Sequence, residues 1–432
     1  MHIAQNLTHL LVLSGLAFAV GCQPYPGGAE SREIRSSSDG SSGVPDREPD
    51  EVFDAGLDAG LDAGLDAGLD AGLDAGLDAG LDAGFGGNPD AGFVDLPIDS
   101  ATVSRLAVLR GNISLRSTAI GRTQLDGTTP TIPLDDSGYT HPSVIHVPEG
   151  WNDFAYWMAI SPYYGPIGHD DQYENPHLFR STDGLHWAEP PGIQNPIDRS
   201  LDAPSQSYWS DPHLVLAPDG VLYCFYRGAG IEFGGRSLVF RTSIDGVHWS
   251  DRQFAYASGT LASVDYTNKL LSPVVIANGE RWDVFDAVRS SPTALLIPAT
   301  KNQTATFVMR RSSSEIASGY GEYDASQVVT FSNRPWGLAQ DPWHLDVRFL
   351  EGRWFMLLNT GLVGASGAHA LWLAVSGDGW TYHVVETPLF GHGTYRSALV
   401  PIAGDRNSAE FLVYRSEMGN GTIDVYELQV SF

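Results

Sequence analysis

Short apolar runs separated by turn residues fill the chain from about residue 101 to its end. Runs such as DFAYWMAIS (153–161), VLYCFYRG (221–228) and RWFMLLNTG (353–361) are rich in aromatic and aliphatic residues, which is typical of strands. Gly, Pro and Asp-Gly stand between the runs and favour tight turns. No segment of ten or more residues here shows the period of an amphipathic helix. The pattern predicts an all-β domain over residues 101–432.

One sequence element recurs along this domain, each time ahead of an aromatic-rich strand and a third strand. The copies are HPSVIHVPEG (141–150), DPHLVLAPDG (211–220), SPVVIANG (272–279), DPWHLDVRFLEG (341–352) and YRSALVPIAG (395–404). Repeated units of three or four antiparallel strands are the signature of a propeller. We therefore predict a five-bladed β-propeller, with a strand within 103–116 closing the ring.

A Ser-x-Asp-Gly-x-x-Trp turn follows the third strand of the first two units, at 181–187 and 243–249. Asp-Gly suits a tight turn, and the Trp can fold back over the edge of the blade. We interpret this turn as structural. Four tryptophans are expected to pack between blades: Trp187, Trp249, Trp282 and Trp354.

The residue that begins each repeated element is a candidate for the site. In a propeller the first strand of each blade is innermost, and its leading end lines the mouth of the axial channel. Proline is tolerated at the start of a strand, and it favours extended geometry in the residue before it. We expect the five leading side chains to face one central cavity; they are His141, Asp211, Ser272, Asp341 and Tyr395.

The stretch SDPHL (210–214) and the blade pattern resemble the five-bladed propeller glycosidase-like superfamily, which includes glycoside hydrolase families 43 and 32. The resemblance implies carboxylates from inner strands around a scissile sugar, with Asp211 stabilising the reaction or tuning a pKa. The sequence departs from the family pattern at two positions. His141 stands where the family has an Asp base or nucleophile, and Ser272 where it usually has a Glu acid.

Other carboxylates can supply the missing groups. YENPHLF (173–179) places Glu174 before a strand, and WHLDV (343–347) places His344 and Asp346 on one strand face. The predicted catalytic residues are Glu174 as general acid, Asp346 as base or nucleophile and Asp211 as tuning group. The predicted substrate-binding residues are His141, Asp341, Trp343, His344, Tyr395, Arg396 and Tyr164.

Each candidate also has a structural interpretation. Asp211 and Asp341 can cap strand amides, Glu174 can pair with an arginine, and Asp346 can lie exposed on a blade edge. No cofactor or metal is predicted, because the sequence has no compact ligand motif. A metal held by His141, His344 and a carboxylate remains the alternative.

The first hundred residues carry no signal of a packed core. Residues 1–21 resemble a lipoprotein signal peptide with Cys22 as the lipidated residue, and Cys224 reads as a small core residue. Residues 22–100 contain tandem DAGL units, in which Gly discourages helix, and predict a disordered acidic linker. The linker carries much of the net charge of −27. That charge therefore says little about the site.

These features predict a lipid-anchored glycoside hydrolase of the bacterial outer membrane, displayed on its periplasmic or extracellular face. The expected partners are a carbohydrate and, through the anchor, the membrane, and we expect a monomer. Nucleic acid is not an expected partner, because Lys269 and Lys301 are the only lysines. The alternative is a non-catalytic propeller that binds carbohydrate or protein. A sialidase-like enzyme is disfavoured, because few arginines could bind a substrate carboxylate.

Overall fold

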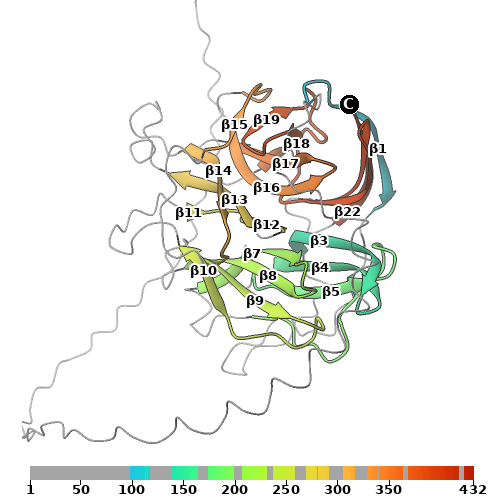
Figure 1. The fold of residues 1–432 in the computed structure, drawn as a ribbon, viewed down its shortest axis with the longest axis vertical. Coiled ribbons are helices and arrows are strands. Elements are labelled where there is room, and N and C mark those ends of the chain that lie inside the picture. Colours follow the sequence, from blue (N-terminus) through green and yellow to red (C-terminus); the bar gives the residue numbers. More distant parts are fainter. Residues whose placement is uncertain are drawn as a thin grey trace, which may run out of the picture. The chain divides into compact units, whose positions relative to one another are not determined.

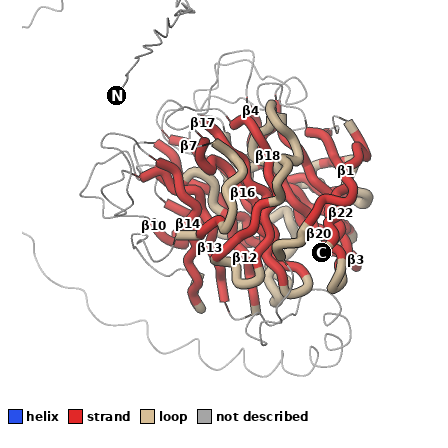
Figure 2. Tube along the Cα trace, turned by 90° about the horizontal axis from the view of Figure 1, so that it is seen from above, coloured by secondary structure: helices blue, strands red, loops and turns tan. Residues whose placement is uncertain are grey.

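The computed structural model describes residues 98–111, 113, 115–116, 138–163, 174–198, 207–230, 237–257, 269–279, 281–290, 305–316, 328–337, 340–362, 368–417 and 423–432. The predicted signal peptide, Cys22 and the DAGL repeats lie outside these residues, as does Tyr164. Within the described ranges the chain forms strands and loops but no helix, so none could span a membrane (Figure 2).

Five sheets, built mainly from antiparallel strand pairs, are arranged around a common centre, as predicted (Figure 1). The first blade holds β3 (Gly138–Trp151), β4 (Phe154–Tyr163), β5 (His177–Ser181) and β6 (Trp187–Ala188). The second holds β7 (Ser207–Leu216), β8 (Leu222–Gly230), β9 (Ser237–Ser243) and β10 (Gln253–Ala257). The third holds β11 (Lys269–Leu270), β12 (Val274–Asn278), β13 (Arg281–Ser290) and β14 (Ala305–Ser313). The fourth holds β15 (Thr330–Phe331), β16 (Gln340–Leu350), β17 (Arg353–Leu362), β18 (Ala368–Ser376) and β19 (Thr381–Val384). The fifth holds β20 (Ala398–Gly404), β21 (Ser408–Ser416) and β22 (Ile423–Ser431).

The start of the domain closes the ring on two blades. β1 (Thr102–Arg110) pairs antiparallel with β22 of the fifth blade, with Ala107 opposite Glu427. β2 (Leu115–Arg116) then pairs in parallel with β6 of the first blade, with Leu115 opposite Trp187. The predicted closing strand is confirmed, and its continuation also joins the first blade.

A hydrophobic core fills each gap between neighbouring blades. Trp187 of the first blade packs against Tyr414 of the fifth, with ring centroids 6.0 Å apart. Trp354 of the fourth blade lies 5.5 Å from Phe285 of the third. Trp282 makes the corresponding contact between the third and second blades, and Trp249 packs, partly buried, on the core between the first two. The prediction that these tryptophans pack between blades is confirmed.

The Asp-Gly turn of the second blade places a glycine under a tryptophan of the first blade. Gly246 has a φ of 73°, and a Cβ on it would lie 2.4 Å from the Trp157 ring. We expect Gly246→Ala to lower the free energy of unfolding by about 2–5 kcal/mol, the sum of left-handed strain and overpacking. Urea denaturation measures the loss. Gly220→Ala is the control, because Gly220 has a φ of 79° but open space around it. Equal losses in the two variants would refute the packing argument.

One arginine and one histidine connect the inner strands of all five blades at the axis. Arg348 of β16 donates through Nε to the Leu399 carbonyl of β20 (2.8 Å) and through Nη2 to the Val144 carbonyl of β3 (3.3 Å). Its Nη1 lies 3.5 Å from Nε2 of His213 on β7, and that nitrogen donates to the Val275 carbonyl of β12 (3.0 Å). These contacts tie the inner strands of the five blades together.

Asp346 is the counterion of this axial arginine. Its Oδ1 lies 2.9 Å from Arg348 Nη1, and its Oδ2 accepts a hydrogen bond from the Leu399 amide (2.7 Å). Asp346 is buried, so it is not on an exposed blade edge. Burial raises its pKa, although the charge of Arg348 opposes that shift.

Candidate functional site

Two of the leading residues adopt a strained backbone. His141 and Asp211 have φ values of 56° and 55°, in the left-handed region, where we expected extended geometry before Pro142 and Pro212. The expectation was wrong because the strand pairing is irregular at both positions. The register of β3 against β4 shifts between Thr140 and Ser143, and the register of β7 against β8 shifts between Ser210 and His213. Such a bulge re-aims a side chain. Left-handed geometry costs about 1–3 kcal/mol in a residue other than glycine, and such strain collects at functional sites.

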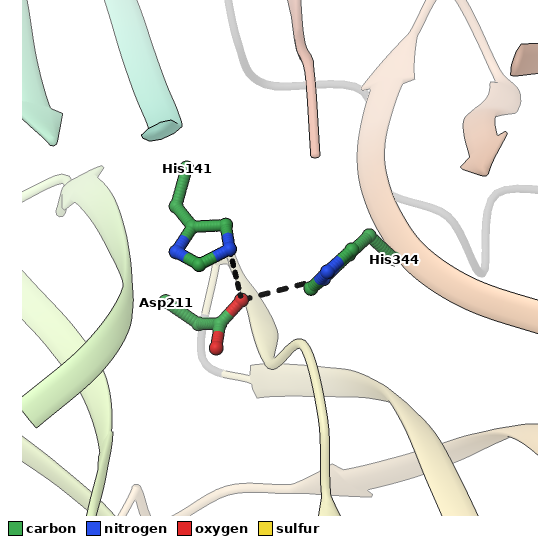
Figure 3. A group of neighbouring side chains, drawn as sticks. All are labelled: His141, Asp211 and His344. Atoms are coloured by element: carbon green, nitrogen blue, oxygen red, sulfur yellow. Dashed lines mark ion pairs between the residues drawn. The ribbon is translucent and has the colours of Figure 1, made fainter. Parts of the chain in front are cut away.

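Side chains from three blades meet at this point (Figure 3). Asp211 Oδ1 lies 3.7 Å from His141 Nε2 and 3.4 Å from His344 Nδ1. One ligand atom from each of the three residues lies within 4.8 Å of the others. All three side chains are buried. We call His141, Asp211 and His344 the central cluster.

Two arginines balance the charge of Asp211. Arg227 Nη2 lies 3.0 Å from Asp211 Oδ2, and Arg396 Nη1 lies 3.4 Å from Oδ1. Burial opposes ionisation of Asp211, but the His141 ring and the Arg227 guanidinium outweigh it and hold its pKa well below the usual range. Burial lowers the pKa of both cluster histidines, against the attraction of Asp211. The cluster therefore combines one carboxylate with two imidazoles whose protonation burial disfavours.

Glu174 approaches the cluster from the segment before β5. The Ser210 hydroxyl donates to Glu174 Oε2, and it also lies 2.8 Å from Asp211 Oδ2. Glu174 Oε2 is 3.5 Å from His141 Nδ1. A single hydroxyl thus bridges two of the three carboxyl groups that the sequence predicted as catalytic.

Aromatic side chains form one wall of the site. The Tyr395 ring stacks on His141 at 5.0 Å and meets His344 edge-on at 4.6 Å. Trp343 meets His344 edge-on at 6.2 Å. Tyr395 and Trp343 are only partly buried. The structure therefore gathers five of the predicted binding residues around one point, including Arg396.

Other predicted residues lie elsewhere. Asp341 forms an ion pair with Arg334 at 3.3 Å. His344, three residues later on the same strand, lies in the central cluster where we expected Asp341. Ser272 is buried and accepts a hydrogen bond from the Leu345 amide (3.4 Å). Asp346 belongs to the axial pair with Arg348. The prediction for Tyr164 falls outside the described residues.

Sequence reasoning missed Asp286 on β13. Its Oδ1 accepts a hydrogen bond from the Ser272 amide (2.9 Å), and it interacts electrostatically with Arg227, Arg396 and Asp211. Burial raises its pKa to about 8, although the Ser272 amide and Arg227 oppose that rise. The signal for it is a carboxylate inside the apolar run VFDAV (284–288), which a pattern built on the leading residues of each unit does not include.

The raised pKa of Asp286 makes stability depend on pH. In the unfolded chain this carboxyl loses its proton above pH 3.8, whereas in the folded protein it keeps it to about pH 8. Stability therefore falls as pH rises across this window. We expect Asp286→Asn to remove this loss. The free energy of unfolding of the variant, relative to that of the wild type, should therefore rise by on the order of 5 kcal/mol between pH 4 and pH 8. Urea unfolding at several pH values measures it, with exposed Asp219→Asn as control. Parallel stability curves would contradict the assignment.

No family model matches the chain. It is 28% identical to an A type blood N-acetyl-alpha-D-galactosamine deacetylase of Flavonifractor plautii, over 67% of this chain and 40% of that protein. The chain thus spans about 40% of the length of this curated relative.

Solved structures match the fold. An N-acetylgalactosamine deacetylase from F. plautii, in complex with blood group B trisaccharide, has a TM-score of 0.55 and 21% identity, covering 76% of this chain and 96% of that one. A family 117 glycoside hydrolase of Zobellia galactanivorans has a TM-score of 0.43 and 9% identity, covering 76% and 90%. The five sheets and the first of these structures confirm the predicted propeller fold.

Proposed function

We propose that this chain is a carbohydrate-acting hydrolase that removes the acetyl group from an N-acetylated sugar with the help of a divalent cation. The similarity to a sugar deacetylase supports the choice of substrate class and reaction. The central cluster carries the proposal, because its geometry suits a cation better than it suits hydrogen bonds.

The distances in the cluster support a bound cation. Asp211 Oδ1 stands 3.4 and 3.7 Å from the nearest imidazole nitrogens, beyond the usual hydrogen-bond range. Ligand atoms bonded at about 2.1 Å to one tetrahedral ion lie roughly 3.4 Å apart. Both nitrogens of His141 and of His344 are buried, and they have no hydrogen-bond partner among the described residues. Two imidazoles and a carboxylate suit Zn²⁺ and related first-row ions.

Residues around the cluster would hold these ligands in place. Arg227 and Ser210 contact Asp211 Oδ2, while Oδ1 faces the histidines and also accepts a hydrogen bond from Arg396 (3.4 Å). Glu174 faces His141 Nδ1, which leaves Nε2 directed to Asp211. A carboxylate that accepts the second ring N–H orients a metal-binding histidine, and a shift of a few tenths of an ångström would bring Glu174 Oε2 to hydrogen-bonding distance. When bound, the cation would polarise the acetyl carbonyl and lower the pKa of the attacking water.

Glu174 is placed to move the proton that amide hydrolysis requires. Water adds to the acetyl carbonyl, the C–N bond breaks, and one proton passes from the water to the leaving nitrogen. Glu174 Oε2 can accept that proton and return it to the nitrogen, as a general base and then a general acid. Its contact with Ser210 keeps it beside the cluster.

Glycosidic cleavage fits this geometry less well. It needs two carboxylates on either side of the sugar bond. Glu174 and Asp211 share the Ser210 hydroxyl, which occupies the space between them, and Asp346 is engaged with Arg348. The proposal keeps Glu174 in proton transfer and gives Asp346 a structural role in place of the expected base.

The experiment compares two products. The purified protein is stripped with a chelator, reloaded with Zn²⁺, Mn²⁺ or Co²⁺, and incubated with oligosaccharides that end in N-acetylgalactosamine or N-acetylglucosamine. We expect acetate release that depends on the added cation and leaves the sugar chain intact by mass spectrometry. Reducing ends without acetate would instead support the glycoside hydrolase. Binding without either product would support the non-catalytic alternative.

We also propose that Cys22 anchors the protein to the outer membrane. The apolar stretch ending in AVGC supports this, since it suits an export signal and is too short to span a bilayer. We expect Cys22→Ser to move the full-length protein from the membrane fraction to the soluble fraction after cell lysis. Wild-type protein in the soluble fraction would overturn the anchor.

A further inference from the structure

Consecutive residues of two blades meet in pairs beside the central cluster. Glu174 and Asn175 precede β5 of the first blade, and Trp209 and Ser210 lie in β7 of the second. The Ser210 hydroxyl donates to Glu174 Oε2, and the Trp209 amide donates to Asn175 Oδ1 (3.3 Å). We call these two contacts the inter-blade clasp.

The clasp is backed by a partly buried ion pair. Arg252 lies with its Cζ 3.9 Å from the centre of the Trp209 ring, and both its Nε and its Nη2 donate to Asp198 at 2.7 Å. The neighbouring Ile197 amide donates to the Pro176 carbonyl (2.9 Å), directly after Asn175. The segment 197–198 therefore supports both halves of the clasp.

Glu174 depends on side-chain contacts for its position. Residues 174–176 are not in a strand, so no sheet ladder fixes them. Ser210 contacts Glu174 and also Asp211 Oδ2 (2.8 Å), and all three are buried. The hydroxyl thus links the proposed proton carrier directly to the proposed cation ligand.

From this arrangement we infer that Ser210 is a positioning residue for the proposed deacetylation, holding Glu174 at a fixed distance from the central cluster. The inference rests on the proposed function, in which Glu174 transfers the proton. Ser210 acts through Glu174 and does not itself carry the proton. A displacement of about 1 Å at a reacting group can cost on the order of 100-fold in rate.

The single variant separates turnover from binding. We expect Ser210→Ala to lower kcat at saturating Zn²⁺ about 10–100-fold, while KM stays within about threefold. Its Zn²⁺ affinity by calorimetry should fall by no more than about 10–100-fold, because Ser210 also contacts the proposed ligand Asp211. Asn175→Ala, which removes the other contact, should give a smaller loss of kcat. Ser250→Ala is the matched control, because Ser250 makes a hydrogen bond in the same blade to the Thr242 amide and lies outside the site. Losses confined to thermal stability would overturn the inference.

A double-mutant cycle tests whether Ser210 acts through Glu174. Glu174→Gln with Ser210→Ala should be no slower than Glu174→Gln alone, since the group that Ser210 positions is already disabled. Losses that multiply would show an independent role and overturn the inference.

A structural readout keeps this inference separate from the proposed function. Wild-type protein that releases no acetate would overturn the deacetylase. The crystal structure of Ser210→Ala would then decide the clasp. A Glu174 carboxylate displaced from Asp211 supports it, and an unmoved carboxylate overturns it.

Discussion

Replacement of Asp211 by Asn is expected to abolish acetate release, with a loss of about 1,000-fold or more in kcat/KM. Asp211 Oδ1 is the charged oxygen that faces both His141 and His344. Loss of a residue that merely orients a metal ligand costs about 10–100-fold, and loss of an anionic ligand should cost more. We expect the affinity for Zn²⁺ to fall by at least the same factor, measured by calorimetry on chelator-treated protein.

Two further variants make this result decisive. Asp211→Asn leaves Arg227 and Arg396 without their counterion, and a broken buried pair can cost about 3–5 kcal/mol in stability. His344→Gln removes a neutral ligand and avoids that penalty, so it should lose Zn²⁺ affinity with a smaller change in stability. Asp219→Asn, on an exposed turn of the same blade, is the control. Unchanged Zn²⁺ affinity in both Asp211→Asn and His344→Gln would refute the cation site.

The fold was predictable because its determinants are local. Strand runs, Asp-Gly turns and the repeated leading element all lie within single units, and each unit must bury its faces against the next. The tryptophans at 187 and 354 were assigned correctly for the same reason. The role of β2, which pairs in parallel with β6, needed a long-range contact that no local pattern encodes.

The candidate site was only partly predictable, because it depends on backbone irregularities. The bulges that turn His141 and Asp211 towards the axis leave no local mark except the following proline. In the fourth blade a similar Asp-Pro pair is present, yet Asp341 pairs with Arg334 and His344 enters the cluster. The same Asp-Pro dipeptide therefore places its Asp side chain in the cluster in one blade and away from it in another. The register of the strands decides between the two.

The carboxylates have surroundings in the structure that the family pattern does not anticipate. Resemblance to glycosidases suggested that acidic residues should act in pairs, which made Asp346 a candidate base. In the structure the axial Arg348 engages it, and Arg348 also bonds to the fifth and first blades. No sequence pattern predicts the contacts of Arg348, since they join inner strands from distant parts of the chain. In our proposal the two histidines, predicted from the sequence to bind substrate, are cation ligands instead.

Replacement of Glu174 by Gln is expected to lower kcat for acetate release about 100- to 10,000-fold, the usual range for loss of a general acid or base. Gln has the same shape and can still accept the Ser210 hydrogen bond, but it cannot take up a proton. Glu174 faces His141 Nδ1, away from the nitrogen that faces Asp211. We therefore expect Zn²⁺ affinity to fall by no more than about 10–100-fold, the cost of losing a residue that orients a ligand.

Measurements of kcat at saturating Zn²⁺ separate the two effects, because saturation restores the cation site in the variant. Glu149→Gln is the matched control, since Glu149 is an exposed glutamate at the far end of the inner strand of the same blade. If saturating Zn²⁺ returned Glu174→Gln to wild-type turnover, Glu174 would support the cation and another group would move the proton. A low kcat that persists at saturation would assign the proton transfer to Glu174.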